Sequence, residues 1–381
     1  MSCSKMRSTS LGFFAVAVLL ALAFVATPGS AVAQSGFVYT STNDPAGNQV
    51  LGWTRATNGA LTAMPGSPFA TQGTGNNHNI PAQGTLAFSP GYKFLFVANP
   101  GSNDVSAFSV ATNGNLTFIN RVTTAVNGGT TPKSVAVSPN GKYLYAVNGV
   151  HSNIIGYTIG ANGSLTAIPN SSRALSSTTN FVEPCQVSFT PTGNFIVVTE
   201  IATSKIDLYK FNNTTGLAGT IRVNASAGAA PFGFGYDKGG HLIVSEMVNS
   251  TVSTYTINSD GTLTIISNQV PDNGLQACWI AVTTNRNFPQ QYAFATDTLS
   301  HTIGAYGVNP DGSITLLSST PLPQGVLSPT DEGLSQDSKF LYIRDGNSFN
   351  LTGWAVGSDG SVTNISTVGG LPQNGLGMIA R

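Results

Sequence analysis

The sequence predicts an all-β protein, a seven-bladed β-propeller with four antiparallel strands per blade, whose last strand closes the first blade. Three observations predict this fold. A short phrase recurs seven times, strand patterns recur with it, and the two ends of the chain supply complementary parts of one blade. A repeat of roughly 50 residues is typical of propellers and related repeat proteins.

The first 33 residues have the pattern of a secretory signal peptide. A short basic region precedes an apolar stretch at residues 11–25, and residues 31–33 read Ala-Val-Ala. Small residues there are typical of a signal-peptidase site, so we expect cleavage before Gln34. A retained anchor is the alternative, but the stretch is shorter than the roughly 20 residues that span a bilayer. We therefore expect residues 34–381 to form one exported domain, periplasmic or extracellular, with no membrane span after cleavage.

The recurring phrase is Asn or Asp, then Gly, a variable residue, an aliphatic residue and usually Thr. Asn-Gly and Asp-Gly tolerate the positive φ angles of a tight hairpin, and the alternation that follows is typical of a strand. Each copy is predicted to be a hairpin turn that leads into the outermost strand of a blade. The central glycines are Gly59, Gly114, Gly163, Gly216 (in a weaker copy), Gly261, Gly312 and Gly360.

The other strands of the unit are clearest in one repeat. Residues 134–137 form a small, apolar first strand, and residues 142–148 and 153–159 form the second and third. The hairpin phrase supplies the fourth strand. Parallels to the first two strands lie at residues 86–99, 187–200 and 334–345.

The ends of the chain predict closure of the ring. Residues 37–40 match a second strand, and the missing first strand is predicted near residues 375–380. A blade built from both ends leaves no free sheet edge. An open solenoid or two β-sandwiches are the alternatives, and the complementary ends disfavour both. Long connections are expected only at residues 65–83 and 170–183.

Composition argues against several classes of function. Charged residues make up 8% of the chain, with 16 Lys and Arg against 16 Asp and Glu. We therefore expect neither nucleic acid nor an anionic membrane as a partner. No metal-ligand spacing or haem-attachment motif is present, so no cofactor or metal is predicted. Cys185 and Cys278 occupy equivalent places two blades apart, which predicts a separation too large for a disulfide.

Polar residues are expected at one mouth of the central channel, because the start of a first strand lies beside the end of a second strand. We predict a cluster with several carboxylates there. Asn and Asp at strand ends also cap turns, so a purely structural role is the alternative. Glu is a poor turn former, which favours Glu200 and Glu246. The second strands end at Asn99, Asn148, Glu200, Glu246, Asp297 and Asp345. The residues predicted just before first strands are Lys133, Cys185, Phe232, Cys278 and Thr330, while His78, His151 and His301 lie in connections and Arg344 adjoins Asp345.

Residues 138–148, SPNGKYLYAVN, resemble the blades of lactonase-type propellers, which include 6-phosphogluconolactonases, carboxymuconate-cyclising enzymes and YVTN-repeat proteins. The resemblance covers nearly the whole mature chain and is more specific for fold than for activity. It implies a site with His and Arg at the start of a first strand and Glu at the end of a second. Here Phe232 stands where that His is expected, while Glu246 matches the Glu.

Two functions remain open from the sequence. The first is a lactone hydrolase, which needs a base and a cation or other donors for the oxyanion. Its predicted catalytic residues are Glu246 and Glu200, with Lys133 or Arg344 as the cation. The second is a non-catalytic propeller that binds a lactone-like or sugar-like molecule, or a protein, at the channel mouth. The residues predicted to contact a ligand are His151, Asp297, Asp345, Asn148 and Phe232.

Overall fold

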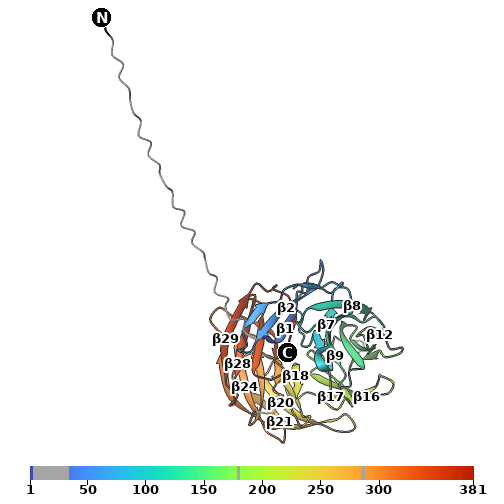
Figure 1. Cartoon of the computed structure of the whole chain (residues 1–381). Coiled ribbons are helices and arrows are strands. Elements are labelled where there is room, and N and C mark those ends of the chain that lie inside the picture. Colours follow the sequence, from blue (N-terminus) through green and yellow to red (C-terminus); the bar gives the residue numbers. More distant parts are fainter. Residues whose placement is uncertain (3–33, 178–180, 285–287) are drawn as a thin grey trace. The chain divides into compact units, whose positions relative to one another are not determined.

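The computed structural model describes residues 1–2, 34–177, 181–284 and 288–381. All but two residues of the predicted signal peptide lie outside these described ranges. Residues 34–381 form one compact unit in which seven sheets surround a common axis (Figure 1). The predicted seven-bladed, all-β propeller is confirmed. In the described ranges, no helix is long and apolar enough to cross a membrane.

Each blade has four antiparallel strands, and the first strands pack against one another around the axis. Blade 1 contains β30 (Leu376–Ala380), β1 (Gln34–Ser41), β2 (Gln49–Ala56) and β3 (Leu61–Ala63). Blade 2 contains β5 (Leu86–Phe88), β6 (Phe94–Asn99), β7 (Asp104–Val110) and β8 (Leu116–Thr123). Blade 3 contains β9 (Thr130–Val137), β10 (Tyr143–Val150), β11 (Asn153–Ile159) and β12 (Leu165–Ala167).

The remaining four blades repeat the same order. Blade 4 contains β14 (Pro184–Phe189), β15 (Phe195–Glu200), β16 (Lys205–Asn212) and β17 (Leu217–Ala225). Blade 5 contains β18 (Pro231–Tyr236), β19 (Leu242–Glu246), β20 (Thr251–Ile257) and β21 (Leu263–Pro271). Blade 6 contains β22 (Ala277–Val282), β23 (Gln291–Asp297), β24 (Thr302–Val308) and β25 (Ile314–Pro321). Blade 7 contains β26 (Pro329–Leu334), β27 (Phe340–Asp345), β28 (Asn350–Val356) and β29 (Val362–Gly369).

The seven predicted hairpins are all present, and their central glycines all have positive φ, between 73° and 86°. A second reason for glycine is close packing between blades. A Cβ on Gly114 would collide with the Phe37 ring of blade 1, and one on Gly59 with Phe340 of blade 7. Tyrosine hydroxyls bind the same turns, because Tyr39 Oη donates to the Gly114 carbonyl at 2.5 Å. The repeated phrase therefore both turns the chain and docks one blade against the next.

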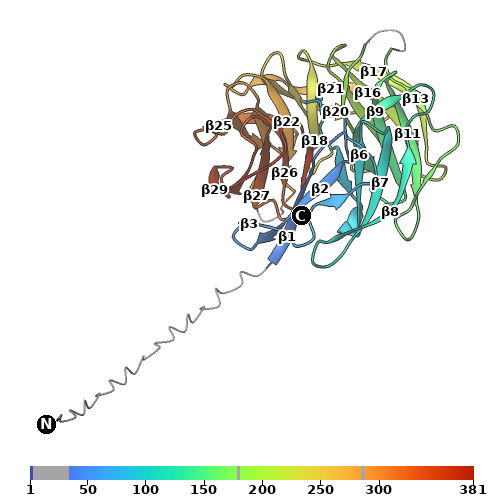
Figure 2. The same cartoon turned by 90° about the horizontal axis from the view of Figure 1, so that it is seen from above.

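The two ends of the chain close the ring as predicted. β30 pairs antiparallel with β1, with Val38 opposite Ala380 and Tyr39 opposite Ile379. β30 is the innermost strand of blade 1, and a view turned by 90° shows the C-terminus close to β1 (Figure 2).

Two details of the predicted strands are corrected. Lys133, Cys185, Phe232, Cys278 and Thr330 lie within the first strands and not just before them. The first strand of blade 7 is Pro329–Leu334, so the segment predicted from residue 334 starts too late. The long connections also contain short strands: β4 (Phe69–Ala70) pairs with β2, and β13 (Arg173–Ala174) pairs with β11.

Candidate functional site

The upper face of the propeller is defined here as the face that carries the turns between second and third strands. The lower face carries the seven glycine hairpins. On the upper side, a β-bulge interrupts the first strand in blades 3 to 7. In blade 3, Pro132 pairs with Asn148 and Ser134 with Val147, so Lys133 is the extra residue. Bulges redirect side chains and are common at barrel rims and next to active sites. The bulge residues of the five blades include Lys133, Cys185, Phe232, Cys278 and Thr330.

Three neighbouring blades form an apolar cluster on this side of the propeller. Phe232 is only 3% exposed and packs edge to face on Trp279, with ring centroids 5.1 Å apart. Cys185 and Cys278 are free thiols buried in the same cluster. Burial raises the pKa of Cys278 to about 12, so the thiol stays protonated and unreactive at neutral pH.

The segment that enters blade 2 lies across the channel and is called the crosspiece (residues 82–84). The Gln83 side chain accepts from Ile280 N at 3.1 Å and donates to Ile280 O at 2.8 Å. Trp279 Nε1 donates to Ala82 O at 2.9 Å, and Val135 N donates to Gly84 O at 2.8 Å. The crosspiece therefore links blades 2, 3 and 6 at the axis. Sequence reasoning missed it because it lies in a long connection that is not repeated.

Replacing Gln83 by Ala should destabilise the propeller by about 2 to 4 kcal/mol, because both backbone groups of Ile280 would lose their side-chain partner. The value is measured as the change in free energy of unfolding in urea. A loss within about 0.5 kcal/mol, the usual effect of a surface substitution, would show that the Gln83 bonds contribute little to holding these blades together.

Lys133 is the charged member of the bulge set. Its side chain is 5% exposed and passes over Gly149, and its ammonium has no hydrogen-bond or ion-pair partner in the described ranges. Burial lowers the pKa of Lys133, and this effect outweighs the nearby Cys185 and Glu183, which act in the opposite direction. A buried cation without a partner is costly, so Lys133 is a candidate ligand contact.

Glu246 is fully buried within blade 5, and its carboxylate accepts five hydrogen bonds. Gly228 N donates at 2.6 Å and Thr251 Oγ1 at 2.6 Å, while the other donors are Ser226, Ser253 and Tyr255. Both oxygens are therefore occupied in holding the connection into blade 5 against its third strand. A catalytic role for Glu246 stays a prediction.

Glu200 has a similar place in blade 4, where Ser176 N donates to it at 2.9 Å and the hydroxyls of Ser176 and Thr203 also donate. Burial, then a hydrogen bond with Glu200, raises the pKa of Asp207 to about 9. In blade 6, burial and the neighbouring Asp272 raise the pKa of Asp297 to about 9. Asp207 and Asp297 thus each hold a proton at neutral pH in the interior of their blades.

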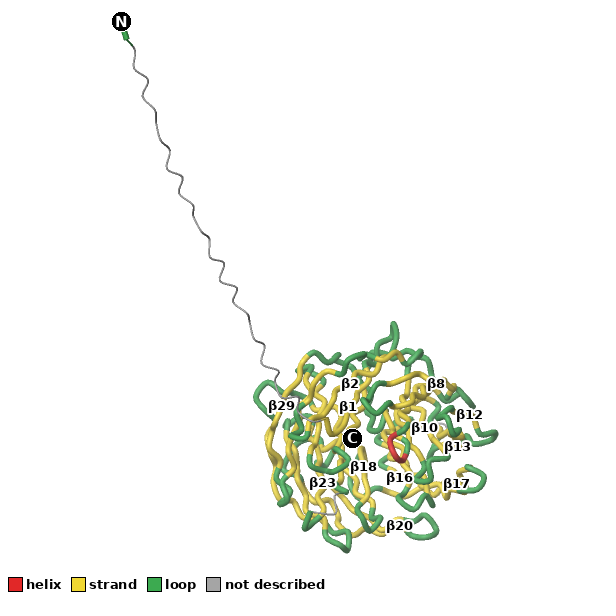
Figure 3. Tube along the Cα trace, in the orientation of Figure 1, coloured by secondary structure: helices red, strands yellow, loops and turns green. Residues whose placement is uncertain are grey.

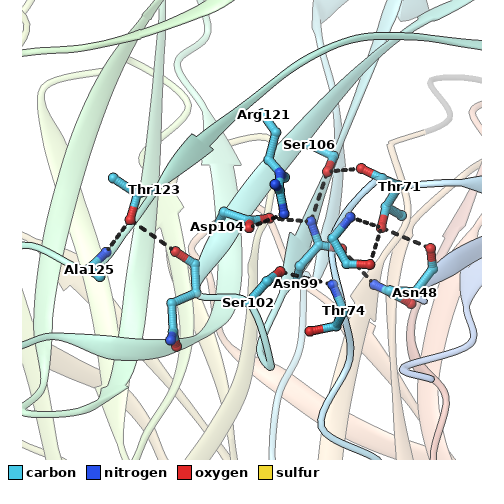
Figure 4. Close-up of polar contacts among 12 residues, drawn as sticks. Asn48, Thr71, Thr74, Asn99, Ser102, Asp104, Ser106, Arg121, Thr123 and Ala125 are labelled. Carbon is cyan, nitrogen blue, oxygen red and sulfur yellow. Dashed lines mark hydrogen bonds and ion pairs between the residues drawn. The ribbon is translucent and has the colours of Figure 1, made fainter. Parts of the chain in front are cut away.

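In blade 2, the side-chain amide of Asn99 at the end of the second strand forms a similar network of hydrogen bonds. Asn99 Nδ2 donates to Asp104 Oδ1 at 2.7 Å and to Ser106 Oγ at 2.8 Å (Figure 4). Asn99 also accepts from Asn48 of blade 1 at 2.9 Å, and Asp104 forms an ion pair with Arg121 at 2.9 Å. The polar residue at the end of this second strand therefore ties the third strand of its own blade to blade 1.

Arg344 and Asp345 lie at the end of β27, and Arg344 contacts the segment that leads to the closing strand β30. Arg344 is completely buried and donates to Thr330 Oγ1 at 2.6 Å and to the carbonyls of Pro372 and Gln373. Burial lowers the pKa of Arg344 to about 10. Asp345 accepts from the backbone of its own turn, at Asn347 and Ser348. Both side chains are thus engaged within blade 7 and the segment that leads to β30.

The last two predicted ligand contacts lie in blade 3. Asn148 Nδ2 donates to Thr124 O and to Asn153 Oδ1. His151 is exposed and lines a cavity of about 250 Å³ with Asn127 and Ser172.

The structure does not gather the predicted carboxylates into one cluster. Each bonds mainly within its own blade or the connection that enters it, and in the described ranges no three His, Cys, Asp or Glu side chains are placed to hold a metal ion. Among the bulge residues, Cys185, Phe232 and Cys278 do pack together in one apolar cluster.

Comparison with known sequences assigns the family. A family model described as "Lactonase, 7-bladed beta-propeller" matches residues 47–182 and 86–372. The chain belongs to this family. Membership supports a lactonase-like function at the level of the family. No curated protein matches the sequence significantly.

Solved structures show how widely the fold of this lactonase-family propeller is shared. The periplasmic gluconolactonase of Pseudomonas aeruginosa is 15% identical, with 90% of this chain and 98% of that chain covered and a TM-score of 0.69. A protein from Lactobacillus plantarum is 17% identical, with 92% and 100% covered and a TM-score of 0.70. The virginiamycin B lyase of Staphylococcus aureus is 14% identical, with 76% and 85% covered and a TM-score of 0.53. At these identities the likeness shows the fold alone.

Proposed function

We propose that the chain is an exported propeller that binds a lactone-like or sugar-like small molecule at the upper mouth of its channel. The nearly buried ammonium of Lys133, which has no partner in the described ranges, carries this proposal. A carbonyl or carboxylate oxygen of a ligand would supply that partner, and an amine in a weakly polar site binds such an oxygen strongly. The signal-peptide pattern supports export, and the similar gluconolactonase of Pseudomonas aeruginosa is periplasmic.

Hydrolysis of a lactone at the same mouth is the second candidate, and family membership favours it. Water would attack the carbonyl carbon, the ring C–O bond would break, and the water's proton would pass to the leaving oxygen, which gives a hydroxy acid. Lys133 would stabilise the oxyanion. The attacking water also needs a general base. The two predicted bases, Glu246 and Glu200, are less suited to this role because their oxygens already accept hydrogen bonds inside their blades.

A protein partner would meet the same face. Val248, Leu275 and Leu299 are 68%, 61% and 56% exposed there. The backbone amide of Leu299 donates to the carbonyl of Leu275, so these two exposed apolar residues are neighbours.

Calorimetric titration with glucono-1,5-lactone and with gluconate tests the binding proposal. We expect saturable binding that Lys133→Met weakens about tenfold or more, the loss of one charge-assisted contact. Lys142→Met, at an exposed lysine on the lower face, is the matched control and should bind like the wild type. Equal binding by the Lys133 variant would remove this residue from the site.

Release of acid from the same lactone tests hydrolysis. A catalytic Glu246 predicts that Glu246→Gln loses about 100-fold or more in rate while it remains folded by circular dichroism. A rate equal to that of spontaneous hydrolysis in the wild type would exclude the hydrolase and leave the binding proposal standing.

A further inference from the structure

One backbone motif is repeated around the upper mouth in blades 3 to 7. Two residues before each bulge residue, the chain adopts a left-handed conformation, with φ between 48° and 66°. In blades 4 to 7 the carbonyl of that residue accepts a hydrogen bond from the residue that follows the second strand, which fixes its place. We call the ten repeated positions the rim. They are the left-handed residues Thr131, Glu183, Ala230, Gln276 and Ser328, and the bulge residues Lys133, Cys185, Phe232, Cys278 and Thr330.

Two of the ten rim positions carry an ordinary charge, and they come from neighbouring blades. Lys133 lies in β9 of blade 3, and Glu183 directly precedes β14 of blade 4. The first strands of these blades are bonded to each other, because Val187 N donates to Ser134 Oγ at 3.1 Å. Figure 3 shows the labelled strands β10 and β16 of the two blades next to each other in the ring. The rim therefore has one cation and one anion, on adjacent blades.

The backbones that carry these two charges are held by the segment that crosses the channel. Thr85 Oγ1, directly after the crosspiece, donates to Lys133 O at 3.0 Å. Gln83 N, within the crosspiece, donates to Cys185 O at 3.3 Å, two residues after Glu183. The positions of both side chains are thus set before any ligand arrives, which lowers the cost of binding.

The two charges are close but do not satisfy each other. Burial lowers the pKa of Lys133, while the nearby Cys185 and Glu183 raise it, so the Glu183 carboxylate lies within electrostatic reach of the ammonium. They form no ion pair, and the half-buried Glu183 carboxylate accepts no hydrogen bond among the described residues. An ammonium only donates hydrogen bonds and a carboxylate only accepts them. A molecule that bridges them must therefore offer an acceptor to one and a donor to the other.

We propose that Glu183 determines which ligands the upper mouth accepts, because it requires a hydroxyl group beside the oxygen that meets Lys133. This inference rests on the proposed binding at Lys133 and adds a second contact to it. The ligand's carbonyl or carboxylate oxygen accepts from Lys133, and its hydroxyl donates to Glu183. A ligand without the hydroxyl would leave the carboxylate desolvated and unpaired, which is costly.

Titration with two lactones, followed by ligand-observed NMR, tests the role of Glu183. Glucono-1,5-lactone carries hydroxyl groups, and δ-valerolactone has the same six-membered ester ring without them. We expect the wild type to bind glucono-1,5-lactone at least about tenfold more tightly, since a site that hydrogen-bonds a hydroxyl rejects the analogue that lacks it. Glu183→Gln should weaken glucono-1,5-lactone about tenfold and leave δ-valerolactone unchanged. Lys133→Met should weaken both.

Asp311→Asn is the matched control, because it removes a carboxylate from an exposed hairpin of the lower face. It should bind both lactones like the wild type, and Glu183→Gln should unfold in urea like the wild type. Equal affinity of the wild type for the two lactones would overturn the role of Glu183. An equal loss for both in Glu183→Gln would also overturn it, by showing that this residue acts only through the charge of Lys133. Either result leaves binding at Lys133 standing, whereas a wild type that binds neither lactone contradicts both proposals.

Discussion

Removal of residues 376–381 is expected to abolish cooperative unfolding of the propeller. These residues are β30, the innermost strand of blade 1, and Thr40 Oγ1 donates to Gly377 O at 2.5 Å across the closure. Leu376 and Met378 are 5% exposed each. Burial of such side chains contributes about 1.5 to 3 kcal/mol each, and the net stability of a domain is only about 5 to 15 kcal/mol. Thermal unfolding followed by circular dichroism measures the effect.

The truncated chain would also expose the inner edge of β1, an unpaired strand that favours aggregation. Adding a synthetic peptide of residues 372–381 should restore part of the transition, because the peptide can occupy the vacant strand position. Met378→Ala, which leaves the backbone pairing intact, should lower the stability by only about 2 to 5 kcal/mol. A truncated chain that melts like the full one would contradict closure by β30.

Stability should fall as the pH rises from about 4 to about 9, and Asp207→Asn should reduce that fall. The folded pKa of Asp207 is raised to about 9 from an ordinary value of 3.8. A raised carboxyl pKa means that the folded state holds a proton that the unfolded state releases. The contribution is therefore complete below about pH 4 and is lost as the pH rises towards 9. The side-chain amide introduced by Asp207→Asn cannot ionise, and it can still donate a hydrogen bond to Glu200.

The expected gain is about 2 to 5 kcal/mol at pH 9 and close to zero at pH 4, measured by urea unfolding at each pH. Asp297→Asn should act in the same direction. The Asp297 carboxyl in blade 6 pairs with Asp272, as the Asp207 carboxyl in blade 4 pairs with Glu200. Asp359→Asn is the control, since this exposed turn residue has its pKa lowered by hydrogen bonds from Ser361. A gain that is equal at both pH values would show that Asp207 is already ionised in the folded protein.

Local pattern predicted most of the fold. Glycine in the hairpin phrase gave seven turns in the right places, because positive φ is a property of the turn itself. Strand 153–159 matches β11 residue for residue. The first strands were less accurate, since Lys133 and Phe232 enter them through bulges. A bulge depends on how two strands pair, so it cannot be predicted from the sequence of one strand alone.

The amino-acid sequence by itself determined the number of blades, the hairpins and the pairing of the two ends. These features depend on the residues of each turn and on a repeat that can be counted. Tertiary structure alone decided which side chains reach the axis. It turned Glu246 into an acceptor for five donors from its own blade and the connection that enters it, placed Gln83 across the channel and left Lys133 without a partner among the described residues. Each of these outcomes depends on contacts between residues far apart in the chain, and burial sets their chemistry only after the blades have packed.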